Sequence, residues 1–228
     1  MDVGESDLER EVLRINARYL DEVVERFDLC PWAKSVRNSA RLHRAVFLGG
    51  TSAPELQAEV SKDIELFSAD GEAEIGLLIF PNHADGATAF RAFVGTLEKA
   101  HADAHPRHDI PLAMASFHPD AEADLSSPAR LVSFIRRSPD PTIQLVRRDS
   151  MAKVREGPSG GSVFAESLDA FMPLMGQKAK LSVSDSIAKN NLETIAGVGV
   201  AALEAIFEDI AEDRKRSYEK ARGAALSQ

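Results

Sequence analysis

The chain has 228 residues, of which 44% are hydrophobic and 28% charged, as in soluble globular proteins that bury a sizeable core. Its formal net charge of −9 argues against general binding to nucleic acids or anionic membranes, since both require a basic surface, and no apolar run approaches the roughly 18 residues of a membrane-spanning helix. The single cysteine excludes an internal disulfide framework and predicts a cytoplasmic location, where thiols stay reduced.

The first predicted element is an amphipathic helix over residues 6–27. Its apolar residues recur at three- and four-residue steps, and Ser6 and Glu9 form the pattern of a capping box. We expect the helix to end near Asp28. Pro31 can then begin a second short helix, because the first residue of a helix does not need the N–H that proline lacks.

Strands and helices alternate through the middle of the chain. Short apolar runs predict strands, and longer amphipathic stretches predict helices. The predicted strands cover residues 42–49, 74–81, 110–119 and 142–148, and the predicted helices cover 52–68, 84–103 and the region from 183 onward. This order predicts an α+β or α/β fold, with a small four-stranded sheet and helices packed on it. A ferredoxin-like sandwich is the favoured arrangement, and a small doubly wound sheet is the alternative.

We predict one domain with an elaborated end. Residues 1–155 form the core that carries the motifs described below. Residues 156–183 are rich in Gly, Ser and Pro yet keep large apolar side chains, which favours a loop or lid over a disordered linker. Residues 184–228 form a C-terminal helical region of the same domain, in which Gly197 and Gly199 indicate a break or close packing. This long amphipathic region favours a homodimer.

Basic residues gather in two segments of this acidic chain. No Asp or Glu occurs in residues 30–54, and residues 130–155 contain seven basic residues against two acidic ones. Such segments indicate a local anion site, while solvated surface is the alternative interpretation.

The first motif is LCPWAK, which contains the only cysteine. If Pro31 opens a helix, Cys30 lies at its cap, facing unpaired backbone N–H groups and the positive end of the helix dipole. Lys34 and Arg37 follow one and two turns later. These three factors favour the thiolate and predict a pKa for Cys30 below its reference value of about 8.5. The alternative is a buried structural cysteine.

The second motif is SFHPD, from Ser116 to Asp120, at the end of a predicted strand. Ligands usually bind at strand ends in open α/β sheets. His118 could serve as a general base and Asp120 could orient it. Cys30, His118 and Asp120 could alternatively hold a metal ion. Three further histidines are predicted to lie on the surface of a polar loop: His101, His105 and His108.

The third motif is IRRSPDPTIQLVRR, in which two arginines precede a proline-rich turn and a strand. Arginine binds carboxylate or phosphate through two parallel hydrogen bonds. Arg136 or Arg137, held beside Ser138 at a rigid turn, would therefore form an anion clamp. An ordinary proline turn with solvated arginines is the alternative.

In series, LCPWAK, ASFHPD and RSPDPTIQLVRR resemble the bacterial DUF1415 family, in which the corresponding motifs read LCPFAK, ASFHPD and RSPYPTLHLLRE. The resemblance covers about residues 8–155. This chain departs from the pattern at Trp32, where the family has Phe, and at Asp140, where it has Tyr. The matching positions are Cys30, Pro31, Lys34, Ser116, His118, Pro119, Asp120, Arg137, Ser138, Pro139 and Pro141.

The resemblance implies a functional role for these positions, because packing alone would select apolar residues at helical or strand period. The leading hypothesis is a cytosolic small-molecule enzyme, a hydrolase or transferase, acting on a substrate with a carboxylate or phosphate. Cys30 would be the nucleophile, His118 the acid or base, and Asp120 its orienting partner or a second acid. The predicted substrate-binding residues are Lys34, Ser116, Arg136, Arg137 and Ser138.

Two alternatives stay open. In the first, Cys30, His118 and Asp120 hold a metal ion and the substrate completes its coordination shell; no other cofactor is predicted. In the second, the protein is not an enzyme and either captures an anion through its arginines or senses oxidants through Cys30. The predicted partner of the leading hypothesis is a small anionic metabolite, with neither nucleic acid nor membrane.

Overall fold

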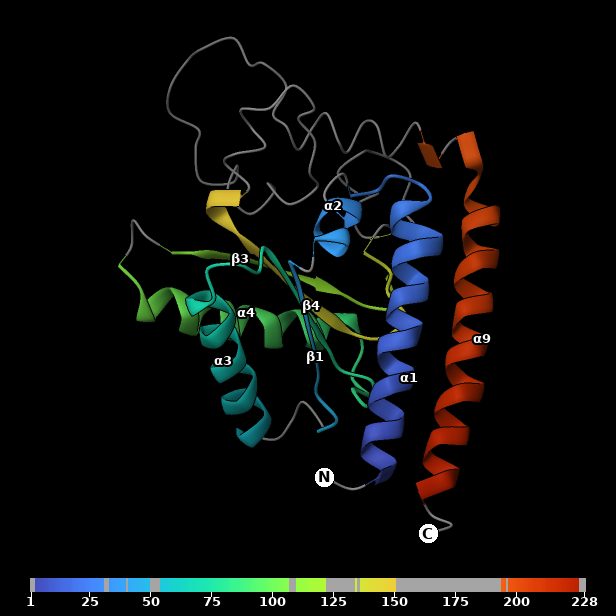
Figure 1. The fold of residues 1–228 in the computed structure, drawn as a ribbon, viewed down its shortest axis with the longest axis horizontal. Coiled ribbons are helices and arrows are strands. Elements are labelled where there is room, and N and C mark those ends of the chain that lie inside the picture. The colour runs from blue at the N-terminus through green and yellow to red at the C-terminus, as the bar shows by residue number, and fades with distance from the viewer. Residues whose placement is uncertain are drawn as a thin grey trace.

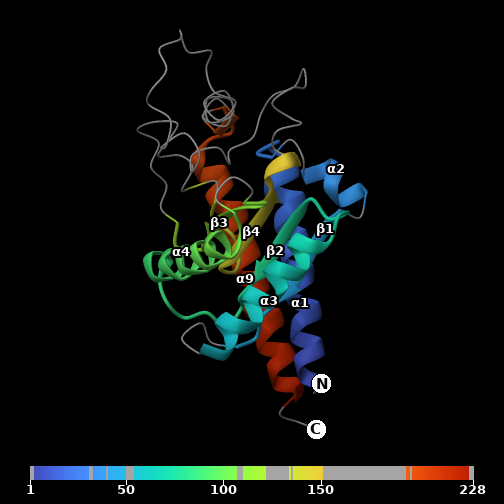
Figure 2. The same cartoon turned by 90° about the vertical axis from the view of Figure 1, so that its left-hand side faces the viewer.

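A central β-sheet separates two layers of helices (Figure 1, Figure 2). The computed structural model describes residues 3–30, 33–39, 41–49, 54–106, 110–121, 134, 136–150, 194–195 and 197–225. The predicted loop or lid over 156–183 and the predicted helix start at Pro31 lie outside these residues. In chain order the elements are α1 (Val3–Tyr19), its π-helical continuation η1 (Leu20–Glu25), α2 (Ala33–Asn38), β1 (Leu42–Val46), α3 (Pro54–Ala69), β2 (Ile75–Ile79), α4 (Ala87–Ala104), β3 (Leu112–Phe117), β4 (Thr142–Arg147) and α9 (Val200–Ala225).

The sheet has the strand order β1-β2-β4-β3. β1 and β2 are adjacent and parallel, whereas β4 is antiparallel to both β2 and β3. The unit β1-α3-β2 is therefore contiguous, and β4 inserts between β2 and β3, the strands that α4 connects. The predicted α+β fold with a four-stranded sheet is confirmed. The ferredoxin-like order is not confirmed, because in that order both βαβ units are split by a further strand.

One face of the sheet is covered by α3 and α4. Leu78 and Phe80 point into this layer, and the ring of Phe80 lies 5.3 Å from that of Phe47 and 5.6 Å from that of Phe90. Full burial of side chains of this size contributes about 1.5–3 kcal/mol each. Both crossover helices therefore lie on the same face, unlike the alternating helices of a doubly wound sheet.

The opposite face of the sheet is covered by α1, η1 and α9. Ile75, Leu77 and Ile79 of β2 pack into this layer. Because β2 is buried on both faces, it reads as an uninterrupted apolar run rather than an alternating one.

The N-terminal helix differs from the prediction at its start and in its last turns. It begins at Val3, three residues before the predicted cap at Ser6. Its end widens into η1, and the N–H of Leu29 donates to the carbonyl of Val24 five residues earlier at 2.9 Å. Asp28, with a φ of 50°, terminates it, since Asp tolerates this left-handed conformation better than most residues. The predicted stop near Asp28 is confirmed.

The long helix α9 runs beside α1 (Figure 1). Arg14 and Arg18 of α1 donate to the carboxylate of Asp213 at 2.9 and 3.0 Å. Gly199, with a φ of 86°, directly precedes α9 and confirms the predicted break. The apolar face of α9, on which the homodimer prediction depended, packs within the chain. In the described part of the chain, no helix has the length and apolar character needed to cross a bilayer.

Replacing Gly76 of β2 by alanine tests the tightness of the α3–α4 layer. A Cβ at Gly76 would lie 3.1 Å from Leu145 Cδ1 and 3.3 Å from Phe67 Cε2. We expect Gly76→Ala to lower the free energy of unfolding by about 1–3 kcal/mol in urea titrations, because the core is overpacked. Gly95→Ala, at an exposed position of α4 where nothing lies within 4 Å of the new Cβ, is the matched control and should stabilise by about 0.5–1 kcal/mol. Equal effects of the two variants would contradict this packing.

The ion pairs between α1 and α9 predict a dependence of stability on pH. Hydrogen bonds from Arg14 and then Arg18 lower the pKa of Asp213 from 3.8 to about 2. Such a carboxylate stabilises the fold above pH 3.8 and loses that contribution as the pH falls toward 2. We expect Asp213→Asn to cost about 1 kcal/mol at pH 7, because the pairs are partly exposed. Denaturant titrations should show this difference shrinking between pH 4 and pH 2; a difference that stays constant would rule out the charge as its origin.

Candidate functional site

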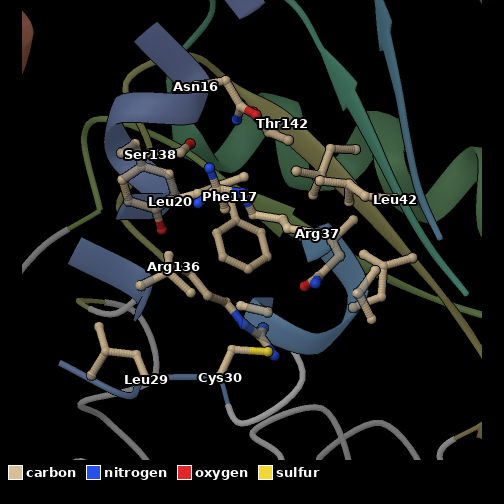
Figure 3. Close-up of a pocket in the computed structure, with 17 residues that line it drawn as sticks. Asn16, Leu20, Leu29, Cys30, Arg37, Leu42, Phe117, Arg136, Ser138 and Thr142 are labelled. Carbon is tan, nitrogen blue, oxygen red and sulfur yellow. The ribbon is translucent and has the colours of Figure 1, made fainter. Parts of the chain in front are cut away.

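A pocket lies between the sheet and the layer formed by η1 and α2 (Figure 3). All three sequence motifs reach it: Cys30 from the first, Phe117 from the second, and Arg136 with Ser138 from the third. Leu20 and most of the other side chains along its length are apolar. The π-helical turn η1 contributes to the wall, and such turns are frequent at functional sites.

Cys30 lies at one end of the pocket and is partly exposed. Its carbonyl accepts a hydrogen bond from the N–H of Ala33, the first residue of α2, at 3.1 Å. Tyr19 lines the same pocket, and its pKa is raised by burial and, to a smaller degree, by the charge of the Cys30 thiolate. The two side chains are therefore electrostatically coupled.

The two cations expected to activate Cys30 are placed differently from the prediction. Lys34 is exposed on α2 and does not line the pocket. Arg37 lines it, but its guanidinium contacts the carboxylates of Asp21 at 2.5 Å and Glu25 at 2.6 Å. These contacts raise the pKa of Arg37, chiefly through the hydrogen bond to Asp21. Arg37 therefore contributes little uncompensated positive charge to the pocket.

Arg136 lies at the same end of the pocket as Cys30, and Figure 3 shows its side chain extending toward the cysteine. Two hydrogen bonds stabilise the turn over residues 138–142. Ser138 Oγ and Thr142 Oγ1 donate to the carbonyl of Asp140 at 2.5 and 2.8 Å. Ser138 thus lines the pocket while its hydroxyl stabilises the turn.

Asp140, the residue that departs from the family pattern, connects this turn to α9. Its carboxylate is 2% exposed and accepts hydrogen bonds from Tyr218 Oη and Arg214 Nε, each at 2.7 Å. A buried carboxylate needs such partners to offset its desolvation. Asp140 therefore forms a buried ionic contact between the third motif and the C-terminal helix.

His118 lies on the other side of the sheet from Cys30. Its ring packs 5.9 Å from that of Phe90, among the side chains under α4. The backbone N–H of Asp120 donates to Nδ1 at 3.2 Å, so the ring hydrogen is on Nε2, which donates to the carbonyl of Asp85 at 3.1 Å. The carboxylate of Asp120 is exposed and 3.6 Å from Nδ1. His118 therefore stabilises the turn after β3, and it is absent from the pocket lining.

Ser116 and Arg137 are also placed away from the pocket. Ser116 alternates with Phe117 along β3, so it points toward the α4 side when Phe117 points into the pocket. Arg137 Nε donates to the carbonyl of Ala121 at 2.9 Å, and its guanidinium lies 5.1 Å above the ring of Phe134 and 5.5 Å from that of Phe207. Through these cation–π contacts, Arg137 connects Phe134 to Phe207 of α9.

The structure therefore brings together Cys30, Arg136 and Ser138 but does not place His118 with them. Cys30, His118 and Asp120 do not form a cluster compact enough for a metal ion. Among the described residues, the ligand atoms close enough for one belong to Glu65, His101 and His105 and lie within 4.8 Å of one another.

The expectation that His101 is a surface residue of a loop was wrong, because His101 belongs to α4 and is 4% exposed, with its Nδ1 2.8 Å from Glu65 Oε1. His105 directly follows α4 and is partly exposed, and His108 lies outside the described residues. The sequence contains a signal for this, since His101 continues the three- and four-residue steps of Phe90, Val94 and Leu97 along the buried face of α4.

Sequence reasoning missed three polar residues that line the pocket. Their side-chain oxygen atoms are buried and have no hydrogen-bond partner among the described residues: Asn16 Oδ1, Tyr19 Oη and Gln144 Oε1. Each such atom costs about 1–3 kcal/mol of stability. Two of these residues can be recognised from the local sequence, because Asn16 lies on the apolar face of α1 and Gln144 interrupts an apolar strand.

Comparison with known families gives a match to the DUF1415 family model, described as a protein of unknown function, over residues 11–170. The chain belongs to the DUF1415 family. The matched region contains the whole sheet and all three motifs, whereas α9 lies beyond it. No curated protein and no solved structure matches the chain.

Replacing His118 in this DUF1415 protein separates its structural role from a role at Cys30. We expect His118→Ala to lower the free energy of unfolding by about 1–3 kcal/mol, because two backbone groups lose their buried partner. The rate of Cys30 alkylation by iodoacetamide in the folded protein should stay unchanged, whereas Arg136→Gln should slow it. A loss of alkylation in folded His118→Ala protein would instead show coupling between the two residues.

Proposed function

We propose that this protein is a cysteine-dependent enzyme, a hydrolase or transferase, that acts on a small anionic substrate bound in the pocket. The observation that carries the proposal is the convergence of Cys30 and Arg136, from motifs far apart in the chain, at one end of one pocket. A thiol supplies the nucleophile, and a guanidinium binds carboxylate or phosphate. We place the enzyme in the cytoplasm, where a lone cysteine stays reduced.

In the proposed reaction the Cys30 thiolate forms a bond to the acyl carbon of the substrate, and the bond from that carbon to the leaving group breaks. The leaving group takes a proton from solvent, which has access because Cys30 is partly exposed. Water in a hydrolase, or an acceptor hydroxyl or amine in a transferase, then attacks the thioester, loses a proton to solvent and releases the thiolate. Arg136 holds the anionic group. In this scheme His118 and Asp120 support the turn after β3.

Activated esters test the nucleophile and the anion site together. Mono-4-nitrophenyl succinate and 4-nitrophenyl butyrate are matched acyl donors, since only the first carries a terminal carboxylate. We expect a burst of one equivalent of nitrophenolate with the succinyl donor and a succinyl adduct on Cys30 by mass spectrometry. Arg136→Gln should slow the succinyl donor about tenfold more than the butyryl donor, as for the loss of one charge-assisted hydrogen bond to the carboxylate.

Cys30→Ala is the control for this experiment and should give neither burst nor adduct. Folded wild-type protein that forms no adduct on Cys30 with either donor would refute the nucleophile. Equal effects of Arg136→Gln on both donors would refute the anion site.

A metal-dependent enzyme is the second candidate, and one observation bears on it. Among the described residues, a metal ion could be held by Glu65, His101 and His105. These residues connect α3 to α4 and do not line the pocket. An ion bound there would stabilise the contact of the two helices without touching substrate. Metal analysis of purified wild type against His105→Ala tests this, and a metal lost in Cys30→Ala instead would restore the Cys30 site.

A binding protein or thiol redox sensor is the third candidate. This candidate uses the same pocket and the same partly exposed thiol, but it predicts no thioester. Formation of a sulfenate on Cys30 with hydrogen peroxide, together with no acyl adduct from either ester, would favour it over the enzyme.

A further inference from the structure

Three buried side chains line the pocket without a partner for their oxygen atoms in the described structure: Asn16, Tyr19 and Gln144. Their residues are only 4%, 4% and 6% exposed. Buried polar atoms are nearly always hydrogen-bonded in folded proteins. Three such oxygens around one pocket therefore indicate a polar group of the ligand as their partner.

Asn16 lies away from the reactive end of the pocket. Figure 3 shows Asn16 and Thr142 at one end and Cys30 with Arg136 at the other, with Phe117 between them. Gln144 is two residues from Thr142 on the same face of β4, because the two residues pair with Leu77 and Ile79 on one face of β2. Tyr19 lies one turn from Asn16 along α1. A ligand that reaches both ends has an apolar middle.

The chemistry of the three side chains defines the group that they fit. Burial raises the pKa of Tyr19, so its hydroxyl stays protonated and all three groups are uncharged. An uncharged set offsets the desolvation of a ligand charge less completely than a charged partner does. The two unpartnered amide oxygens accept hydrogen bonds, and the Tyr19 hydroxyl can donate or accept one. The matching ligand group is uncharged and also offers both N–H and C=O.

We propose that the substrate carries an amide-type group, namely a carboxamide, ureido or lactam group, bound by Asn16, Tyr19 and Gln144 while its anionic group lies at Arg136. This inference rests on the pocket and anion site proposed above and adds a second point of recognition. It also explains why two amides occur in walls that are mostly apolar.

Two series of linear acids test the inference by calorimetric titration. The first series runs from succinamate to suberamate and ends in a primary carboxamide; the second contains the same acids with an isopropyl group in place of the carboxamide. We expect the wild type to bind at least one carboxamide acid about tenfold more tightly than its isopropyl counterpart. Asn16→Leu and Gln144→Met should reduce this preference to about twofold or less, whereas Arg136→Gln should weaken both acids equally.

Unfolding of the ligand-free protein gives an independent measurement. Gln144→Met should raise Tm, because an unpaired buried amide is replaced by an apolar side chain of similar length. Thr142→Val is the matched control on the same face of β4 and should lower Tm, because Thr142 Oγ1 donates to the Asp140 carbonyl at 2.8 Å.

The outcomes separate the two proposals. Equal affinity for carboxamide and isopropyl acids, with both weakened by Arg136→Gln, would overturn the amide inference and leave the anion site standing. A lower Tm for Gln144→Met would likewise overturn it, since the amide would then have a satisfied partner in the free protein. Absence of wild-type binding to every acid of both series would overturn both proposals.

Discussion

β2 lies at the centre of the molecule, with Ile75, Leu77 and Ile79 under α1 and α9 and with Leu78 and Phe80 under α3 and α4. Every other element is positioned by packing against this strand or against its neighbours. The interior is close-packed, so the two layers cannot shift independently of the strand between them. The sheet consequently divides the protein into two sides, and the polar groups of one side are separated from those of the other.

The pocket lies on the α1 side of the sheet, because the regular α-helical geometry of α1 ends there. The helix widens into the turn of η1, the chain reverses at Asp28, and α2 begins a few residues later. These changes leave a space over β2 and β4 that apolar side chains do not completely fill. Cys30 and Arg136 lie at one end of this space, and Asn16 lies at the other.

The other side of the sheet holds histidines in structural positions. His118 bonds two backbone groups in the turn after β3, and His101 bonds Glu65 between α4 and α3. A histidine enclosed by such bonds stabilises the elements that it connects. The buried carboxylate of Asp140 has a similar role, since it connects the third motif to α9, beyond the region shared with the DUF1415 family.

The sequence by itself determined the strands and helices, the four-stranded sheet and the segments that meet at the pocket, because periodicity and turn residues act locally. The predicted strands and central helices appear within three residues of their predicted ends. Only the tertiary structure decided which side each motif faces. Phe117, the last residue of β3, lines the pocket, whereas the next residue, His118, lies across the sheet, because alternate side chains point to opposite faces. Which of these two side chains faces the pocket depends on the register of β3 with β4. This register is set by contacts between residues far apart in the chain, so no local sequence pattern reveals it.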